Sequence, residues 1–324
     1  MEFFHKVPRI HFMASRKWCY AFSAVLIIAS IVALIRPGLN YGIDFTGGVA
    51  VEVAFPSTAD LDKARHAITT AGFPEAQTQY FGTSRDVVIR LEPHEGMSGT
   101  VIGTKIIEAL KAVDPGVELR RVDVVGPQVG EELRQKGYLA MLFTFIFIMA
   151  YLWFRFEFKL SCGAILAALH TPIIILGFFA VTRMTFDLTV LAAVLAVVGY
   201  QINDTVVVFD RARERFPLMR GAPPAEVLDA AINQTLSRTI ITHGATSIVV
   251  TTLLVLGGET LRGFATAFLV GIIVGTYSSI YIASAFVVSR LIASGKLDPK
   301  AERDFTLQYE QIRADRKAAA GVGV

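Results

Sequence analysis

The chain has few charged residues for its length. Only 18% of its 324 residues are Asp, Glu, Lys or Arg, whereas roughly a quarter are charged in soluble domains. Apolar residues make up 53%, which excludes a wholly soluble chain and a disordered one. The net charge is only +3, and no basic domain for nucleic acid is present. This composition predicts an integral membrane protein.

Cysteine is also scarce, and the residue groups that carry most enzyme chemistry are missing. The two cysteines, Cys19 and Cys162, both lie in apolar runs, which excludes a disulfide framework and a cysteine-based metal site. No nucleophile–base pair, catalytic triad or metal-ligand cluster has the necessary spacing. We therefore expect neither an enzyme nor a bound metal or cofactor.

Six apolar runs are long enough to cross a bilayer core, which takes about 20 residues in a helix. They predict spans at 18–36, 138–154, 160–182, 186–209, 239–256 and 264–289. Arg16 and Lys17 precede the first run, as basic residues precede the apolar part of a signal peptide. This run is too long for a signal peptide, however, and residues 35–37 offer no small-residue cleavage site. We expect it to be a retained anchor.

The distribution of Lys and Arg predicts the orientation of these spans. The N-terminus 1–17, the loop 210–238 and the tail 290–324 are rich in basic residues, whereas the short loops on the opposite side hold one each, Arg183 and Arg262. Basic residues favour the cytoplasmic side of a membrane. Both termini are therefore expected in the cytoplasm, and residues 37–136 are expected in the periplasm.

Residues 37–136 have the pattern of a small α+β domain. Apolar alternation predicts strands at 49–55, 77–81, 87–91 and 117–125, with helices at 60–71 and 98–113 between them. Ser57 or Thr58 is the expected cap of the first helix. The order βαββαβ is typical of the ferredoxin-like split unit, in which two helices cover one face of an antiparallel sheet. We interpret it as a binding or docking module outside an all-α six-helix membrane bundle.

Asp204 is the most costly residue in the predicted spans. It lies seven residues before Arg211, which places it roughly 10 Å along the helix axis. A carboxylate at that depth costs a few kcal/mol, so it must face the bundle interior, a cavity or a partner. Tyr200, Asn203, Asp204 and Val207 share one helix face. Asp204 either loads and releases a proton, or ties helices together.

The fifth span carries a polar stripe that offers a partner for this acid. The stripe consists of Thr235, Arg238, Thr239, Thr242, His243 and Thr246. A polar stripe faces protein or water rather than lipid. Arg238 either reaches Asp204 or extends to the cytoplasmic surface. His243, and His170 in the third span, are either members of a proton relay or hydrogen-bonded core residues, with a haem between them a remote alternative.

Several motifs in register resemble the SecD/SecF family of protein export membrane subunits, and the resemblance covers nearly the whole chain. They are residues 41–48 (YGIDFTGG), 125–130 (VGPQVG), 154–157 (FRFE), 199–211 (GYQINDTVVVFDR), 234–239 (QTLSRT) and 275–279 (GTYSS). The single small exterior domain is of the SecF type. The resemblance implies a fold related to the RND superfamily, with this chain as one six-span half of a twelve-span unit.

The resemblance also implies a function and a set of partners. It implies an accessory subunit of the Sec preprotein translocase that pairs with SecD and uses the proton motive force to complete translocation across the bacterial inner membrane. The SecYEG channel, the translocating preprotein and membrane lipid are implied contacts, with YajC and YidC as further candidates. An RND-like exporter of a small molecule or lipid and a purely structural scaffold are the alternatives. The small exterior domain leaves little room for a substrate pocket.

Carried over residue by residue, the resemblance assigns roles to particular positions. The proton-coupling acid falls on Asp204 and its arginine partner on Arg238. Relay candidates are Asn203, Thr239, Thr242, His243 and His170. Asp44, with Gly42, Gly47 and Gly48, falls where the exterior domain meets the membrane, and the glycines are expected to supply backbone freedom. The chain departs from the family pattern at Gln201, at His243 and at Thr171, where the family commonly has Asp.

Overall fold

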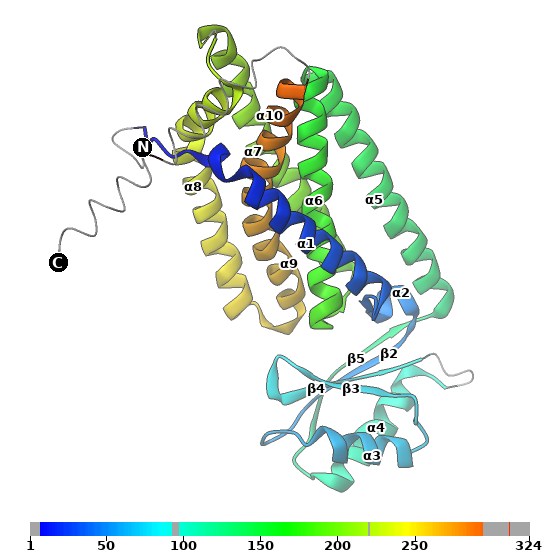
Figure 1. Ribbon diagram of the computed structural model, residues 1–324. Coiled ribbons are helices and arrows are strands. Elements are labelled where there is room, and N and C mark those ends of the chain that lie inside the picture. The colour runs from blue at the N-terminus through cyan, green and yellow to red at the C-terminus, as the bar shows by residue number, and fades with distance from the viewer. Residues whose placement is uncertain (1–6, 93–96, 220, 294–310, 312–324) are drawn as a thin grey trace, which may run out of the picture.

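The computed structural model describes residues 7–92, 97–219, 221–293 and 311. Figure 1 shows a bundle of long helices with a smaller α/β domain beyond one end of it. Most of the predicted tail 290–324 lies outside the described residues.

Six helical segments of the described chain are long and apolar enough to cross a membrane. The first is α1 (Arg16–Ile35), which follows the short 3-10 helix η1 (Phe12–Ser15). The next four are α5 (Pro127–Arg155), α6 (Phe158–Thr182), α7 (Leu188–Leu218) and α8 (Pro224–Leu256). The last runs continuously through α9 (Gly258–Tyr277), the π-helical η2 (Ser278–Ala283) and α10 (Ser284–Ala293).

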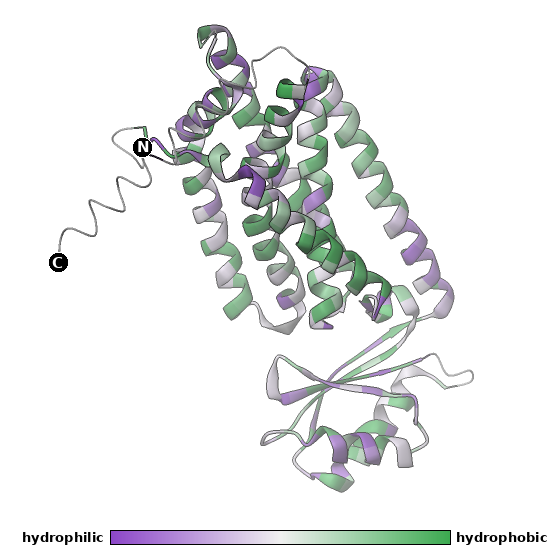
Figure 2. Cartoon of the chain, viewed as in Figure 1, coloured by the Kyte–Doolittle hydropathy of each residue, from purple (hydrophilic) through white to green (hydrophobic). Residues whose placement is uncertain are grey.

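Apolar side chains cover the outside of this bundle as well as its interior. Figure 2 shows hydrophobic residues along most of the helices, and hydrophilic residues mainly at helix ends and in the α/β domain. Phe154 is 90% exposed and Trp18 is 82% exposed. Aromatic side chains so exposed would be costly in water but not in lipid. The chain is a multi-pass membrane protein.

The helices α7 and α8 extend well past the predicted spans. Residues 210–238, which the sequence places between two spans, are helical over most of their length, because α7 continues to Leu218 and α8 begins at Pro224. Pro224 occupies the first turn of α8, where its missing N–H costs nothing. At the same end of the bundle an ion pair of 2.5 Å joins Arg155 to Asp210, and so α5 to α7.

The exterior domain has the predicted βαββαβ order. Its elements are β2 (Gly48–Ala54), α3 (Leu61–Thr70), β3 (Gln77–Phe81), β4 (Thr83–Leu91), α4 (Gly99–Val113) and β5 (Glu118–Val125). The strands form an antiparallel sheet in the order β3-β4-β2-β5, and α3 and α4 cover one face of it. The alternating residues Val49, Val51 and Val53 are buried beneath these helices.

The predicted cap of α3 is wrong. Asp60, rather than Ser57 or Thr58, precedes the helix, and its Oδ1 accepts hydrogen bonds from the backbone N–H groups of Asp62 and Lys63, each at 3.1 Å. Asp is as good a cap as Ser. The helix begins at Leu61, one residue later than predicted, and just before it Ala59 N donates to the Ser84 carbonyl of β4.

Candidate functional site

Asp204 lies inside the bundle, on the face of α7 that meets α8. Its side chain is buried, with 6% of the residue exposed. Asp204 Oδ1 accepts a hydrogen bond of 2.6 Å from Thr239 Oγ1 on α8. Among the described residues, no hydrogen-bond partner reaches the second oxygen, Oδ2. The carboxyl group therefore keeps one oxygen for a proton or another donor.

A line of polar side chains continues from this pair between α7, α8 and α9. His243 lies one turn beyond Thr239 on α8, and its Nδ1 is 2.5 Å from Thr276 Oγ1 of α9. The His243 ring packs against Tyr200 of α7, with 5.1 Å between the ring centroids. The Tyr200 hydroxyl in turn is 3.0 Å from Thr246 Oγ1. The sequence predicts Tyr200 beside Asp204 and Thr246 in the stripe, but not that the two side chains meet.

The other side chains of the predicted site lie in different surroundings. Arg238 is exposed on α8, and in the described part of the chain no ion pair joins it to Asp204. Asn203 is exposed on the outside of α7. Thr242 Oγ1 donates to the carbonyl oxygens of Arg238 and Thr239 within its own helix.

His170 belongs to a second polar cluster, on another side of α7. It is 2% exposed on α6, and its ring lies 6.2 Å from that of Tyr277. Nearby, Gln201 Nε2 and Ser278 Oγ both donate to the Ala167 carbonyl, at 2.9 and 3.2 Å. Neither ring nitrogen of His170 has a hydrogen-bond partner among the described residues. Among the described residues, no hydrogen bond joins this cluster to the Asp204–Thr239 pair.

The 41–48 motif forms the junction between the bundle and the exterior domain. The short helix α2 (Ile43–Thr46) follows the two-residue strand β1 (Asn40–Tyr41), which pairs with β6 (Thr185–Phe186) just before α7. Gly42 N donates to the Phe186 carbonyl at 2.9 Å. Asp44 Oδ2 accepts from Leu188 N at 3.1 Å, so this carboxylate helps to satisfy the N-terminus of α7.

The glycines of this motif are needed for two different reasons. Gly47 and Gly48 have positive φ angles of 70° and 123°. A Cβ at Gly48 would lie 2.2 Å from the Leu91 carbonyl oxygen, and one at Gly47 would lie 2.8 Å from Pro127 Cα. Gly42 has an ordinary φ of −73°, and its requirement is for space, because a Cβ there would lie 3.2 Å from Asp187 Cβ.

Sequence reasoning missed several polar groups at this junction. Arg90 of β4 donates to Thr185 Oγ1, which ties the sheet to β6. Burial lowers the pKa of Arg90, and Asp187 opposes this shift. The Tyr41 hydroxyl is 3.2 Å from that of Tyr138. Burial, together with this hydroxyl contact, raises the pKa of Tyr41 to about 12. Arg90 lies between the buried Ile89 and Leu91, and this alternation is the one available signal that it points away from the core.

No metal centre is apparent in the described ranges. No three His, Cys, Asp or Glu side chains come together there in a group that could hold an ion. A buried carboxyl group with one free oxygen, a hydroxyl donor and an imidazole one turn away can bind and release a proton.

This combination defines a polytopic membrane protein with a small α/β domain beyond one end of its helix bundle. A family model described as protein export membrane protein SecD/SecF, C-terminal, matches residues 105–291, and one described as the SecD/SecF GG motif matches residues 32–55. The chain is 48% identical to the protein translocase subunit SecF of Vibrio alginolyticus, over 94% of this chain and 96% of that protein. It is 44% identical to SecF of Pseudomonas aeruginosa, over 92% and 97%. The chain belongs to the SecD/SecF family.

Solved structures of the family agree with this fold. The crystal structure of SecDF, a translocon-associated membrane protein from Thermus thermophilus, superposes with a TM-score of 0.79 at 37% identity, over 87% of this chain and 38% of that chain. SecDF in its super-membrane-facing form gives a TM-score of 0.65 at 34% identity, over 97% and 40%. The chain therefore spans less than half the length of these SecDF chains.

Proposed function

We propose that this chain is an accessory subunit of the Sec preprotein translocase that acts with SecD and uses the proton motive force to complete translocation across the inner membrane. The observation that carries the proposal is the buried Asp204 carboxyl group, bonded through one oxygen only to Thr239. A carboxyl group buried inside a membrane span costs free energy, and such residues are therefore usually functional.

The direction of the two helices orders the polar side chains along the proton path. With both termini in the cytoplasm, α7 runs inward and α8 runs outward. Tyr200, His243 and Thr246 then lie on the periplasmic side of Asp204, and Arg238 lies on its cytoplasmic side. A proton enters by way of the His243 region, binds Asp204, and leaves towards the end where Arg238 lies. Asn203 and His170 lie off this path.

Proton binding to Asp204 changes the hydrogen bonds that can form between α7 and α8. The ionised Asp204 only accepts hydrogen bonds, whereas the protonated group also donates one. The hydrogen-bond pattern between the two helices therefore differs between the two states. The outer end of α7 is attached to the exterior domain through Asp44 and Gly42, so a shift of α7 is transmitted to the domain that faces the preprotein.

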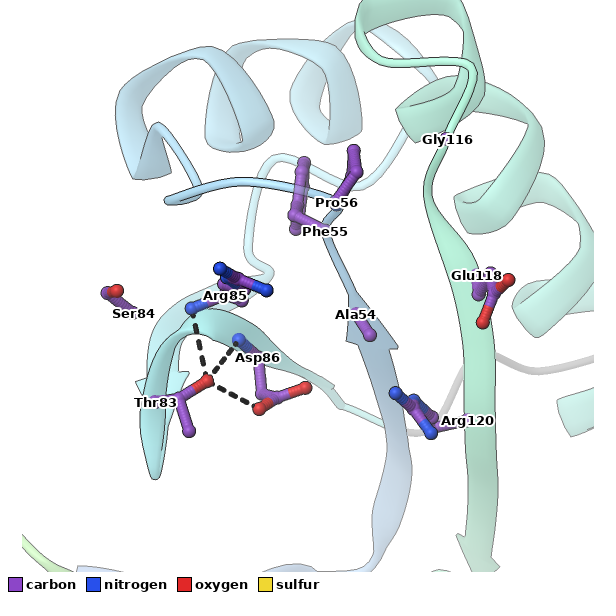
Figure 3. A pocket seen from close by; sticks show the side chains of 10 residues that line it. All are labelled: Ala54, Phe55, Pro56, Thr83, Ser84, Arg85, Asp86, Gly116, Glu118 and Arg120. Carbon is purple, nitrogen blue, oxygen red and sulfur yellow. Dashed lines mark hydrogen bonds between the residues drawn. The ribbon is translucent and has the colours of Figure 1, made fainter.

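The chemistry of the exterior domain favours a polypeptide over a small apolar substrate. A cavity of about 540 Å³ opens between β2, β4 and β5. Figure 3 shows the charged side chains of Arg85, Asp86, Glu118 and Arg120 around it. Pockets for drugs and lipids are lined predominantly by apolar side chains. This lining supports protein export rather than the alternative of a small-molecule or lipid exporter.

The length of the solved SecDF chains supports a SecD partner for this chain. The chain matches 38–40% of the SecDF chains, so we propose that SecD supplies the remaining spans of a joint unit. SecYEG and the preprotein are the further partners of this unit, with YajC and YidC as additional candidates. Membrane lipid covers the exposed apolar faces.

The test is the clearance of a secreted precursor in cells depleted of this chain and resupplied with a variant. We expect wild type to clear the precursor and Asp204→Asn to leave it accumulated at equal membrane abundance. Glu214→Gln, an acid-to-amide change on the exposed part of α7, is the matched control and should clear it. Clearance by Asp204→Asn would remove the proton role and leave a scaffold. Absence of accumulation on depletion would contradict an export function.

A further inference from the structure

The N-terminal residues 10–15 lie across the cytoplasmic half of α8, and we call them the strap. Figure 1 shows the first described residues beside α8, towards the end of the bundle opposite the exterior domain. The strap contains η1 and leads directly into α1. Its side chains Phe12 and Met13 are 8% and 0% exposed, and they are part of the largest core cluster of the bundle.

Asn233 of α8 holds the backbone of the strap from both sides. Its Oδ1 accepts a hydrogen bond of 3.0 Å from Ile10 N, and its Nδ2 donates one of 2.7 Å to the Ile10 carbonyl. Asn233 is 6% exposed, and its Nδ2 also donates to the Asp229 carbonyl. The Asn side chain has both an acceptor and a donor, so it can bond the N–H and the C=O of one residue at the same time. An ionised Asp side chain can only accept, and a Leu side chain can do neither.

Asp229, one turn earlier on α8, holds the next part of the strap. It is 4% exposed, and its Oδ1 accepts from Met13 N at 2.9 Å. Its Oδ2 lies 3.8 Å from His11 Nδ1, and the charges of Arg16 and Glu226 also act on it. The two attachment points lie four residues apart on α8. The strap cannot leave α8 without exposing buried polar groups.

The attachment lies close to the Asp204 site along the same helix. Asn233 precedes Thr239 by six residues, a rise of about 9 Å along α8. Thr239 is the donor to Asp204. An α-helix is stiff over two turns, so a shift of α8 at Asn233 also moves Thr239. The attachment at Asn233 therefore affects the position of Thr239 relative to α7.

We propose that Asn233 is a positioning residue for proton coupling: by fixing the strap to α8, it joins α1 to α8 and holds Thr239 against Asp204. This inference rests on the proposed function of Asp204. Asn233 is uncharged, so its removal alters the position of α8 without altering the charge near the site.

The chain offers a matched pair of variants for the test. Asn233→Leu keeps the branched shape of the side chain and removes both bonds to Ile10. Thr235→Val removes a buried hydroxyl from the same stretch of α8, where it bonds only to carbonyl groups of its own helix. The variants are compared in the full chain with SecD, in inverted membrane vesicles, as the rate of proton-driven export at a series of external pH values.

We expect Asn233→Leu to reduce the proton-driven rate at least fivefold and to shift the pH of half-maximal rate in the same direction as Thr239→Val. Thr235→Val should behave as wild type. Because both substitutions act on one contact, the Asn233→Leu/Thr239→Val double variant should show no further shift beyond that of Thr239→Val. A structural weakening unrelated to Asp204 would instead lower the rate without moving the pH profile, and would add to the effect of Thr239→Val.

Asp204→Asn is measured alongside to separate two kinds of failure. If Asp204→Asn is inactive while Asn233→Leu matches Thr235→Val in rate and pH profile, the positioning role is wrong and the proposed function stands. If Asp204→Asn is itself fully active, the proton function fails and the positioning role fails with it. Equal abundance of all variants in the vesicles is checked by immunoblot.

Discussion

Thr239 Oγ1 on α8 donates a hydrogen bond of 2.6 Å to Asp204 Oδ1 on α7. Both residues are buried, with 4% and 6% of their surface exposed, and they join two helices that are consecutive in the chain. This contact, rather than a salt bridge to Arg238, is the direct link between the buried acid and the polar stripe of α8. It leads to the first prediction.

Replacing Thr239 by Val keeps the shape of the side chain and removes the donor to Asp204. A hydrogen bond to a charged group contributes about 1.5–3 kcal/mol, so we expect proton-driven export to slow by roughly tenfold or more. Thr239→Ser retains the hydroxyl and should stay within a few-fold of wild type. The measurement is the export rate in energised vesicles. Equal rates for the Val and Ser variants would show that the bond has no part in coupling.

The second prediction concerns the strained junction glycine. A Cβ at Gly48 would lie 2.2 Å from the Leu91 carbonyl oxygen, and its φ is +123°. We expect Gly48→Ala to destabilise the exterior domain by more than about 1 kcal/mol.

Gly72 is the matched control, because its φ is +99° and a Cβ there would meet nothing within 4 Å. Gly72→Ala thus carries the cost of the backbone angle without the clash. The measurement is the temperature at which the exterior domain of the full chain becomes sensitive to protease. A Gly72→Ala variant as labile as Gly48→Ala would show that the contact with Leu91 is unimportant.

The third prediction is a pH dependence at the start of α3. The backbone N–H of Lys63 bonds the Asp60 carboxylate and lowers its pKa. Because the folded pKa is below the unfolded one, the stabilisation is present above the unfolded pKa of about 3.9 and is lost as the pH falls through the lowered folded value.

Hydrogen–deuterium exchange of residues 61–64 measures this effect, with variants compared at equal pH. Asp60→Ala should exchange faster than wild type at neutral pH. Asp60→Asn keeps an acceptor for these N–H groups but cannot titrate. In this variant the amides of residues 61–64 should stay protected at neutral pH, and their protection should not fall further in acid. An identical acid response in wild type and Asp60→Asn would rule out the carboxylate as its cause.

Local patterns in the sequence determine much of this protein. The six apolar runs are set by the thickness of a bilayer, and the βαββαβ order by alternation and turn residues, both of which act over neighbouring residues. The burial of Asp204 also follows from the sequence, because the energetic cost of a charge in lipid leaves few alternatives. Motif resemblance adds the family and, with it, the positions of interest.

The contacts of the site required the tertiary structure. Arg238 and Thr239 are adjacent in sequence and differ by about 100° around the helix, so a polar stripe cannot say which of them meets Asp204. That choice depends on the rotation of α8 against α7. The sequence does not predict the strap, because residues 10–15 have no hydrophobic periodicity. Their conformation depends on Asn233 and Asp229, more than two hundred residues away. The sequence by itself determined which segments enter the membrane and which acid must be buried there, whereas helix packing decided which side chains surround that acid.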